Sequence, residues 1–341
     1  EGSAASHAAI VARALQIPCV GRLMGLRDRL SEGDMVIADG ETGEAYLRPR
    51  ADMLEAPQSR MDVRQQRQAE FAQLRDFIYQ QCGIYVADNR KYLLENRLAN
   101  RLKHLNLKNF AEYYYYLQYD AGRKEELNRL FEVITTNETS FYRNPPQLQV
   151  FQDQILSDVL QALRKSGQRK LRIWSAGCST GEEPYTMAMI IAEVLKTELA
   201  SWDVRITAND LSERVLESAR RGVYNEYTLR TTPKEILARY FDKQDMFYNV
   251  RPELKKLILF HQINLSDMTQ VKRVERSQII FCRNVIIYFD DDMKKKVIGS
   301  FYDNLLPGGY LIIGHSESLH NISRAFKPIH YPGAIIYKKE E

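Results

Sequence analysis

The sequence lacks the features that mark disulfide-rich, zinc-binding and membrane-spanning proteins. It contains 4 cysteines in 341 residues and no CxxC pair, which argues against a zinc site or a disulfide framework and favours a reducing compartment. No apolar run approaches the ~20 residues that span a bilayer, and no signal peptide opens the chain. We therefore expect a cytoplasmic protein with no direct membrane insertion and no bound metal.

Net charge and phosphate-binding motifs are also scarce. The formal net charge is +4, too small to indicate a nucleic-acid partner by itself, so none is predicted. The stretch "WSAGCSTGEEPYTMA", residues 174–188, follows the apolar run "LRIW" and has the outline of a nucleotide-binding strand, loop and helix. It contains neither GxGxxG nor GxxxxGK[ST], so it is not an ordinary phosphate loop.

Two acids stand at the entrance of the helix in that stretch. Glu182 and Glu183 follow the turn at Gly177 and Gly181, where they would repel a pyrophosphate from the helix N-terminus. The loop therefore suits a ligand that brings an adenosine and a positive charge, and S-adenosylmethionine has both an ammonium and a sulfonium. The alternative is that both glutamates are ordinary first-turn residues, because the helix dipole favours acids there.

The first part of the chain reads as a short α+β segment and then as helices. Residues 1–55 predict a helix, "SHAAIVARAL", and a hairpin, "DMVIADGETGEAYLRP", followed by a polar linker, "APQSRMDVRQQRQ". Residues 56–135 predict an all-helical domain, because leucines recur at one helical face. These leucines are Leu94, Leu98, Leu102 and Leu105.

The remaining residues, 136–341, predict an α/β domain with a doubly wound, mostly parallel sheet. From residue 171 onward, strand-like runs such as "DVRITAND" and "SQIIFCRNV" alternate with helix-like runs, and Ser212 is a plausible N-cap of one helix. The tail "FKPIHYPGAIIYKK" predicts an antiparallel hairpin, and residues ~222–262 form an insertion relative to a minimal sheet. Ligands of such sheets bind at the C-terminal strand ends.

Polar residues follow the predicted strands at those ends. Asp210 ends the second strand, where an acid can hold both ribose hydroxyls of an adenosine. Asn264 and Leu265 follow the third candidate strand, where an amide and an apolar side chain could read and cover an adenine edge. The last strand carries Arg283, Asn284 and Tyr288 at its end. The alternative for each is a polar residue that caps a loop.

These residues carry a family resemblance that covers the chain from about residue 66 to its end. The stretches "ITTNETSFYRNPPQL", "IWSAGCSTGEEPYTMAM", "ITANDLSERVLESARRGVY", "INLSD" and "IIFCRNVIIYFD" resemble the chemoreceptor glutamate methyltransferases of the CheR family. The resemblance implies a Rossmann-like methyltransferase fold, with S-adenosyl-L-methionine as methyl donor and S-adenosyl-L-homocysteine as product. It also implies that a glutamate side chain of a chemoreceptor becomes a methyl ester, as in chemotactic adaptation.

The resemblance also implies which positions contact the cofactor. They lie in the first motif, in the glycine loop and at the strand ends. They are Asn137, Thr139, Arg143, Glu182, Asp210, Asn264, Leu265, Arg283 and Asn284.

The implied chemistry needs few polar groups. A glutamate carboxylate is ionised at neutral pH and is already the nucleophile, so positioning and desolvation can suffice. We predict that Arg143 steers the acceptor carboxylate, because its planar fork matches that group. Tyr288 is the second catalytic candidate, as a hydrogen-bonding wall beside the sulfonium; the alternative is a buried aromatic with a satisfied hydroxyl.

The predicted helical domain has a basic face. Arg97, Arg101, His104 and Lys108 recur at helical spacing. The family resemblance implies docking onto the acidic helical bundle of a chemoreceptor's cytoplasmic part, and we expect Arg97 and Arg101 to make this contact. The alternative is an ordinary solvated surface. Relatives that bind a receptor's tail peptide have a longer, glycine-bearing loop in the insertion. Here "DKQDMFYN" is short and lacks glycine, which argues against a peptide tether.

Residues 1–55 resemble the latter part of the mobile phosphohistidine domain of phosphoenolpyruvate-utilising enzymes. In "EGSAASHAAIVARALQIPCVG", His7 matches the phosphorylated histidine and Ala5 replaces a common threonine. A piece of this size cannot bury much core by itself. Two alternatives to the methyltransferase function therefore stay open: a non-catalytic S-adenosylmethionine-binding signalling module, and a methyltransferase regulated by a phosphohistidine at His7. A remnant that serves as a docking surface is the third reading of this segment.

Overall fold

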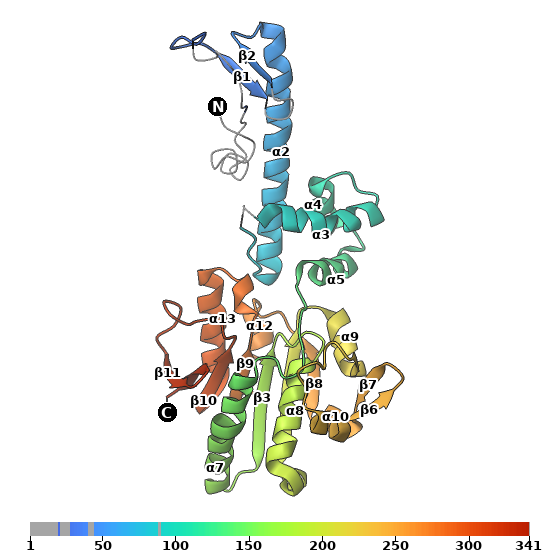
Figure 1. Ribbon diagram of the computed structural model, residues 1–341, viewed down its shortest axis with the longest axis vertical. Helices are drawn as coiled ribbons and strands as arrows, with labels where there is room; N and C mark the ends of the chain where they lie inside the picture. Colours follow the sequence, from blue (N-terminus) through green and yellow to red (C-terminus); the bar gives the residue numbers. More distant parts are fainter. Residues whose placement is uncertain (1–19, 21–27, 40–43, 88–89, 341) are drawn as a thin grey trace. The chain divides into compact units, whose positions relative to one another are not determined.

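A computed structural model describes Val20 and residues 28–39, 44–87 and 90–340, without the side chains of 39, 51–64 and 93 (Figure 1). The predicted first helix and His7 lie outside these residues. The chain divides into two compact units, Glu1–Ala72 and Gln73–Glu341. No helix among the described residues is long and apolar enough to cross a membrane.

The first unit contains the predicted hairpin. Strands β1 (Val36–Asp39) and β2 (Glu44–Leu47) pair antiparallel. Next to them, the Arg48 guanidinium donates to both carboxylate oxygens of Asp34, at 2.7 and 2.8 Å. This hydrogen-bonded ion pair lowers the pKa of Asp34 to about 2. The hairpin prediction is confirmed.

The predicted linker is wrong, because helix α2 runs from Ala51 to Cys82 without a break. The segment is rich in Gln and Arg, which are good helix formers, and its side chains at 65–69 are exposed. A polar stretch can therefore be a solvated helix as well as a linker. No break in secondary structure marks residue 55, so the three predicted domain ranges stay a prediction.

Three helices follow α2, as the leucine pattern predicted. Leu94 and Leu98 are buried, and Leu102 and Leu105 are half-buried near the end of the first of these helices. The side chain of Asn109 caps the next one by accepting from the backbone N–H of Glu112. The helices are α3 (Lys91–His104), α4 (Phe110–Tyr119) and α5 (Arg123–Ile134).

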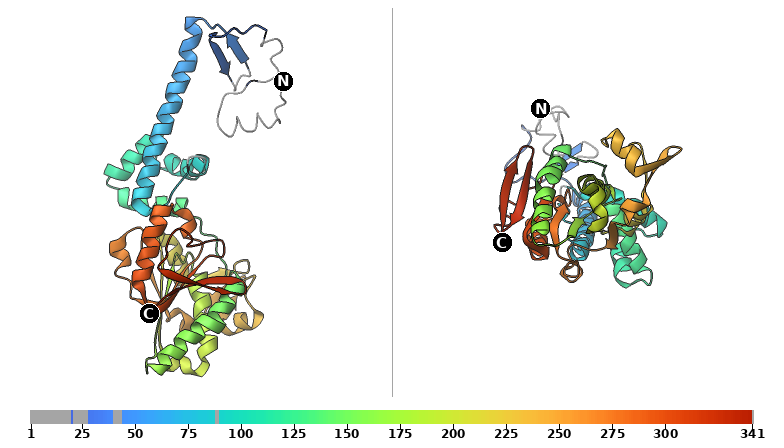
Figure 2. Two further views of the ribbon diagram at one scale, coloured as in Figure 1. Left: turned by 90° about the vertical axis from the view of Figure 1, so that its left-hand side faces the viewer. Right: turned by 90° about the horizontal axis from the view of Figure 1, so that it is seen from below.

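The second unit is organised by a 7-stranded sheet in the order β11-β12-β10-β9-β3-β4-β8. Strands β10, β9, β3, β4 and β8 run parallel, and the hairpin β11–β12 adds an antiparallel edge (red in Figure 2). The predicted α/β fold and tail hairpin are confirmed. The strands are β3 (Lys170–Ala176), β4 (Asp203–Asp210), β8 (Ile258–Gln262), β9 (Ser277–Cys282), β10 (Leu305–Ile313), β11 (Phe326–Tyr331) and β12 (Ala334–Lys339).

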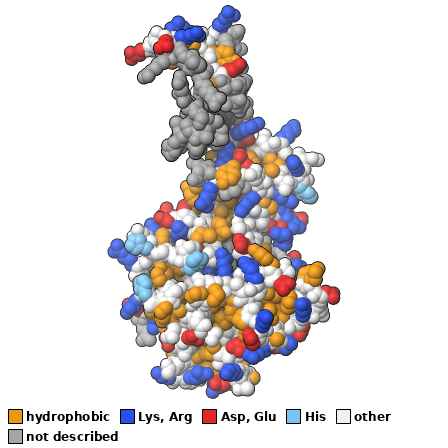
Figure 3. All heavy atoms as spheres, in the orientation of Figure 1, with side chains coloured by type: hydrophobic (Ala, Val, Ile, Leu, Met, Phe, Trp, Pro, Cys, Tyr) orange, Lys and Arg blue, Asp and Glu red, His pale blue; other side chains and the backbone are white. Residues whose placement is uncertain are grey.

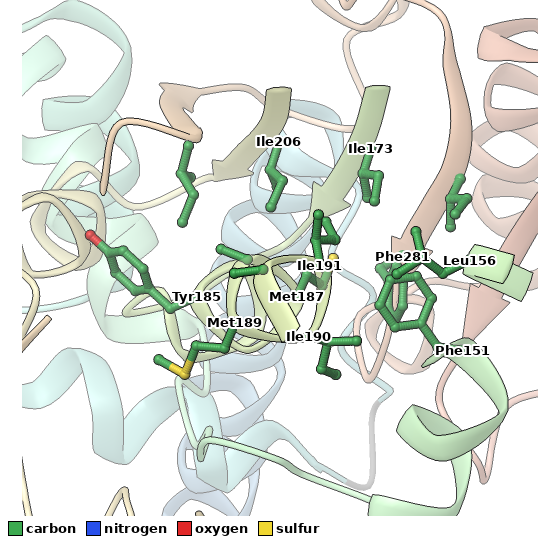
Figure 4. Close-up of a cluster of buried hydrophobic side chains, with 14 of the residues drawn as sticks. Phe151, Leu156, Ile173, Tyr185, Met187, Met189, Ile190, Ile191, Ile206 and Phe281 are labelled. Atoms are coloured by element: carbon green, nitrogen blue, oxygen red, sulfur yellow. The ribbon is translucent and has the colours of Figure 1, made fainter. Parts of the chain in front are cut away.

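Helices cover both faces of this sheet because its strands are apolar on both sides. Along β3, Ile173 belongs to one buried cluster and Trp174 to the other, and Ile279 and Ile280 alternate in the same way on β9. Figure 4 shows Ile173 and Ile206 of the strands above the apolar side chains of α8. One face is covered by α6 (Pro145–Val150), η2 (Phe151–Leu156), α7 (Ser157–Lys165) and α8 (Glu182–Leu195), and the other by α12 (Met268–Val271) and α13 (Asp291–Asn304).

The insertion forms a separate 3-stranded antiparallel sheet in the order β5-β7-β6. Its Tyr224 ring meets Phe141 at 4.7 Å, and the carbonyl of Thr228 accepts from the backbone N–H of Phe141 at 2.9 Å. The insertion thus supports the segment 137–143, which carries the first sequence motif. Its elements are β5 (Val223–Asn225), α10 (Lys234–Tyr240), β6 (Phe241–Gln244), β7 (Phe247–Val250) and α11 (Pro252–Lys255), and the other short elements are η3 (Lys196–Ser201), α9 (Glu213–Arg221) and η4 (Ile286–Tyr288).

Candidate functional site

A cavity lies at the carboxyl ends of the parallel strands. It lies at β3, from which later strands are added first on one side, as β4 and β8, and then on the other, as β9 and β10. Ligands of open α/β sheets bind at this place. The cavity encloses about 1250 Å³ of space, including the part open to solvent. Of the residues predicted at the site, the cavity is lined by Asn137, Thr139, Arg143, Asp210, Asn264, Leu265, Arg283, Asn284 and Tyr288.

The glycine turn after β3 is drawn toward the end of β4. The backbone N–H groups of Gly177 and Cys178 both donate to the carbonyl of Asn209, each at 2.8 Å. Gly177 has φ +80°, and a Cβ there would lie 2.4 Å from Cγ2 of Val285. Only glycine therefore allows this close approach between the loops that follow β3 and β9.

Asp210 is a buried carboxylate at the centre of the cavity wall. Its two oxygens accept from the backbone N–H groups of Ser179, at 2.9 Å, and Ser212, at 3.1 Å. Burial raises the pKa of Asp210 above its ordinary value, although these bonds oppose the shift. Each carboxylate oxygen has a second lone pair, so a pair of hydroxyls fits here. Ser212 is the N-cap residue of α9 as predicted, but its hydroxyl makes no capping hydrogen bond within the described residues.

The two glutamates at the start of α8 have different surroundings. Glu183 lines the cavity and accepts from the Ser175 hydroxyl at 2.8 Å. Glu182 does not line the cavity; it is 1% exposed and accepts from the Thr180 hydroxyl at 2.7 Å. Burial raises the pKa of Glu182 to about 7. The predicted cofactor contact of Glu182 rests on the family resemblance and stays a prediction, because residue type and spacing do not separate it from Glu183.

Arg283 is an incompletely paired cation beside Glu183. Its side chain is 4% exposed, with one nitrogen 3.3 Å from the Glu183 carboxylate and another donating to the carbonyl of Arg143 at 2.6 Å. Its Nε is buried and has no hydrogen-bond partner among the described residues. Burial lowers the pKa of Arg283, and Glu183 opposes this shift. An orphaned donor on a cavity wall favours a ligand that brings an acceptor.

Arg143 is presented to the cavity by an unusual stretch of backbone. Its neighbours Tyr142 and Asn144 have φ +50° and +60°, in the left-handed region that is rare for a bulky residue such as tyrosine. The backbone N–H of Tyr142 donates to the Thr186 hydroxyl at 3.2 Å, and the Arg143 guanidinium donates to the carbonyl of Glu138 at 3.2 Å. Strained backbone of this kind gathers at functional sites.

Asn264 and Leu265 line the cavity, but the predicted role of the Asn264 amide meets an obstacle. The amide nitrogen donates to the carbonyl of Gln81 at 2.6 Å, and the amide oxygen accepts from both the backbone N–H and the hydroxyl of Ser266. This side chain therefore ties the strand end to the end of α2. Leu265 is 7% exposed and offers an apolar surface.

Tyr288 and Thr139 line the cavity, and neither hydroxyl makes a hydrogen bond within the described residues. The carbonyl of Tyr288 accepts from the backbone N–H of Tyr85 at 2.8 Å, which holds this segment in place. Asn137 is tied to the glycine loop, because its carbonyl accepts from the Ser179 hydroxyl at 3.2 Å.

The predicted docking residues lie outside the cavity and make internal bonds. The Arg97 guanidinium donates to the carbonyl of Ile134 at 2.5 Å and to the Thr136 hydroxyl at 2.8 Å. Arg101 forms a two-pronged ion pair with the buried Glu126. Both side chains thus connect helices of their own domain, and their docking role stays a prediction.

Cysteine and metal chemistry find no support at this site. Burial raises the pKa of Cys82 to about 12 and those of Cys178 and Cys282 well above the ordinary thiol value. Buried thiols with raised pKa values are poor nucleophiles. Within the described part of the chain, no group of at least three His, Cys, Asp or Glu residues could hold a metal ion.

Several residues that build the site were missed in the sequence. Asn209 accepts from the Trp174 indole at 2.7 Å and donates to the carbonyl of Ile263 at 3.1 Å, so it links β3 and β4 to the residue that follows β8. Glu317 accepts from backbone N–H groups of the loop after β9. Asn209 stands directly before Asp210, and this position next to a strand end was the only signal available. Glu317 had none, because its partners are distant in the chain.

Comparisons with known proteins agree with this geometry. Residues 137–335 match the family model described as "CheR methyltransferase, SAM binding domain", and residues 69–135 match "CheR methyltransferase, all-alpha domain". Residues 1–43 match "PEP-utilising enzyme, mobile domain". His7 lies in this last match but outside the described residues, so its phosphorylation stays a prediction.

Relatives align over most of their own length. Chemotaxis protein methyltransferase 2 of Vibrio cholerae is 34% identical over 75% of this chain and 88% of its own. The chemotaxis protein methyltransferase of Borreliella burgdorferi is 36% identical over 79% and 94%. Chemotaxis protein methyltransferase 1 of Pseudomonas aeruginosa is 34% identical over 79% and 97%.

Proposed function

The chain belongs to the CheR methyltransferase family, and from this membership we propose that it transfers a methyl group from S-adenosyl-L-methionine to glutamate side chains of chemoreceptors. The proposal rests most directly on the cavity, where residues of the family's motifs meet at the ends of β3, β4 and β9. The product is a glutamyl methyl ester, which removes a negative charge from the receptor.

The donor groups of the cavity fit this cofactor. Asp210 offers carboxylate oxygens to ribose hydroxyls, and Leu265 offers an apolar surface to an adenine. Glu183 lines the wall with a negative charge for an ammonium, while Arg283 lines it with a guanidinium for a carboxylate. When bound, S-adenosylmethionine supplies an electrophilic methyl group on a sulfonium.

The chain's own residues then have to orient the acceptor and exclude water. The Arg143 guanidinium holds the acceptor carboxylate through its planar fork, so that one oxygen points along the line of attack. Tyr288 lines the same cavity and would add a second polar group beside the acceptor. The acceptor is ionised at neutral pH and loses no proton to an enzyme base. The half-buried position of Arg143 strengthens its hold on the carboxylate, because the local dielectric is lower than that of water.

For the protein partner we propose the helical bundle in a receptor's cytoplasmic part. Exposed cations surround the three helices of the helical domain, and they can attract an acidic helical surface. They are Arg97, Lys103, Lys108, Arg123, Lys124 and Arg129. On the face drawn in Figure 3, basic and acidic side chains are interspersed over the region of the large sheet.

The test is methyl transfer in a defined mixture. The protein is incubated with radiolabelled S-adenosylmethionine and a receptor signalling fragment, and alkali is then added. We expect volatile methanol to be released from glutamyl esters, and none when the receptor's acceptor glutamates are changed to alanine. Binding of S-adenosylhomocysteine without any ester would instead favour a signalling module that binds the cofactor and does not catalyse.

A further inference from the structure

Glu317 is a carboxylate that connects two loops beneath the cavity. It lies just after β10, where its Oε2 accepts from the backbone N–H of Gly314 at 2.6 Å and from that of Asn284 at 2.9 Å. Its Oε1 accepts from the backbone N–H of Ile287 at 3.2 Å. Because β9 and β10 are neighbouring parallel strands, one side chain joins the loops that follow both of them.

The surrounding backbone is shaped for this contact. A Cβ on Gly314 would lie 2.6 Å from the Glu317 Oε2 and 3.0 Å from the backbone nitrogen of Asn284. Asn284 itself has φ +59°, a left-handed conformation that asparagine tolerates better than most residues. The carboxylate approaches both N–H groups only because position 314 has no side chain and position 284 turns its N–H inward.

The segment held in this way carries much of the cavity wall. Arg283, Asn284, Ile287 and Tyr288 line the cavity, whereas Glu317 does not. The far end of the segment is held independently, through the hydrogen bond from the Tyr85 N–H to the Tyr288 carbonyl. Without Glu317 the near end would lose its charged acceptor, and three backbone donors would lose their partner. Hydrogen bonds to charged groups are the stronger kind.

We propose that Glu317 is a positioning residue of the cofactor site, which acts by holding the backbone of residues 283–288. It neither touches the cofactor nor takes part in the transfer. The consequence for cofactor binding rests on the proposed function, while the consequence for the loop does not. A small carboxylate can replace the side chain, because Glu317 is only partly buried and its partners are simple N–H donors.

The experiment uses the full chain with Glu317→Ala and Glu317→Gln, and with Ser316→Ala as control, since Ser316 is exposed in the same turn. Without any cofactor, amide hydrogen exchange of a peptide spanning 283–290 should rise at least about tenfold in Glu317→Ala, as expected for one lost charged hydrogen bond. Adding formate, but not chloride at equal ionic strength, should restore slow exchange. Ser316→Ala should behave as the unchanged protein.

The second measurement is calorimetry with S-adenosylhomocysteine. Its affinity should fall about tenfold or more in Glu317→Ala and recover with formate, and Glu317→Gln should lie between, because an amide oxygen can still accept part of these bonds. Unchanged exchange at 283–290, or a loss that formate does not restore, overturns the proposal. Should Glu317→Ala fail to fold, exchange in Glu317→Gln decides the question. If the unchanged protein does not bind S-adenosylhomocysteine, the proposed function fails, and the exchange result still judges Glu317.

Discussion

Two arginine–glutamate pairs, one in the helical domain and one in the cavity, differ in how completely they are satisfied. Arg101 reaches both oxygens of the buried Glu126, which also accepts from the Tyr113 hydroxyl at 2.7 Å. Arg283 meets Glu183 at a single 3.3 Å contact, and its buried Nε has no hydrogen-bond partner in the part of the chain that the structure describes. We call Arg101–Glu126 the closed pair, because its ion pair is fully hydrogen-bonded, and Arg283–Glu183 the open pair. The closed pair stabilises the fold, whereas the open pair on the cavity wall leaves charge for a ligand.

The largest expected effect would confirm the closed pair. Arg101→Ala leaves the Glu126 carboxylate buried without its cation, and we expect the free energy of unfolding to fall by about 3–5 kcal/mol in urea denaturation. The double change Arg101→Met with Glu126→Met should recover most of the loss, because replacing both partners removes the unpaired charge. A loss below about 1 kcal/mol in Arg101→Ala would show that the pair behaves as a surface ion pair.

In the cavity that contains the open pair, Arg143→Ala should lower the rate of methyl transfer more than it lowers the affinity for the cofactor. We expect kcat for ester formation to fall by about 10²–10³, the usual effect of removing one positioned donor at a reacting oxygen. The affinity for S-adenosylhomocysteine should fall far less. Arg143→Lys keeps the charge without the fork and should fall between. If turnover drops only in proportion to cofactor affinity, Arg143 is a cofactor contact alone.

The roles of the neighbouring acids Glu182 and Glu183 can be distinguished by the pH dependence of stability. The pKa of Glu182 is raised to about 7 from an ordinary 4.5, so the folded protein holds its proton more tightly than the unfolded chain. The resulting stability is present below about pH 4.5 and is lost as pH rises toward 7. Glu182→Gln has no such proton and keeps its stability over this range. The unfolding free energy of the variant minus that of the unchanged protein should therefore be about 3 kcal/mol larger at pH 8 than at pH 4.5.

Glu183→Gln is the matched control for that measurement. It removes a charge that faces both Arg283 and the cavity, so it should weaken S-adenosylhomocysteine binding, whereas Glu182→Gln should not. The reverse order of affinities would support the contact implied for Glu182 by the family resemblance and would remove Glu183 from the site.

A substitution of Asp210 tests the proposed contact with the ribose hydroxyls of the cofactor. Asp210→Asn should weaken S-adenosylhomocysteine binding by about 1–3 kcal/mol in calorimetry, because charge-assisted bonds to hydroxyls are lost. Asp203→Asn is the control at the opposite end of the same strand, where Asp203 accepts from Arg172 at 2.5 Å. It should alter stability and leave affinity unchanged. Equal affinity in both variants would take Asp210 out of the site.

The smallest expected effect is on the rate of receptor methylation when cations of the helical domain are reversed. Arg101 cannot be used for this test, because it belongs to the closed pair. Reversing Arg101 would unfold helices before it reported on a partner, so the exposed Lys103 and Lys108 are better probes. Lys103→Glu with Lys108→Glu should slow receptor methylation a few-fold at low salt, less than about 1 kcal/mol. The difference should vanish at high salt, and Lys165→Glu on α7 should have no effect.

A receptor without its C-terminal tail is the companion substrate for this assay. We expect it to be methylated as well as the intact receptor, because the loop "DKQDMFYN" is short and lacks glycine. Loss of methylation on removing the tail would mean that the β5-β7-β6 sheet binds a peptide after all.

Local patterns in the sequence were enough to predict the large sheet and most helices. Apolar runs mark β3, β4 and β9 because a parallel sheet covered on both faces needs apolar side chains on both. The polar stretch at 56–68 was misread as a linker because composition alone cannot separate a solvated helix from a coil. The motif residues predicted for the site lie around one cavity, with the exception of Glu182.

The sequence by itself thus determined the order of strands and helices and the chemistry available at each strand end. Tertiary structure alone decided which of two adjacent glutamates faces the cavity and which of the two arginine–glutamate pairs has both carboxylate oxygens bound by its arginine. It also decided that the Asn264 amide ties down α2 and that Glu317 reaches the loop after β9. The physical reason is that a polar side chain's role depends on the donors and acceptors it meets on burial, and these come from distant parts of the chain.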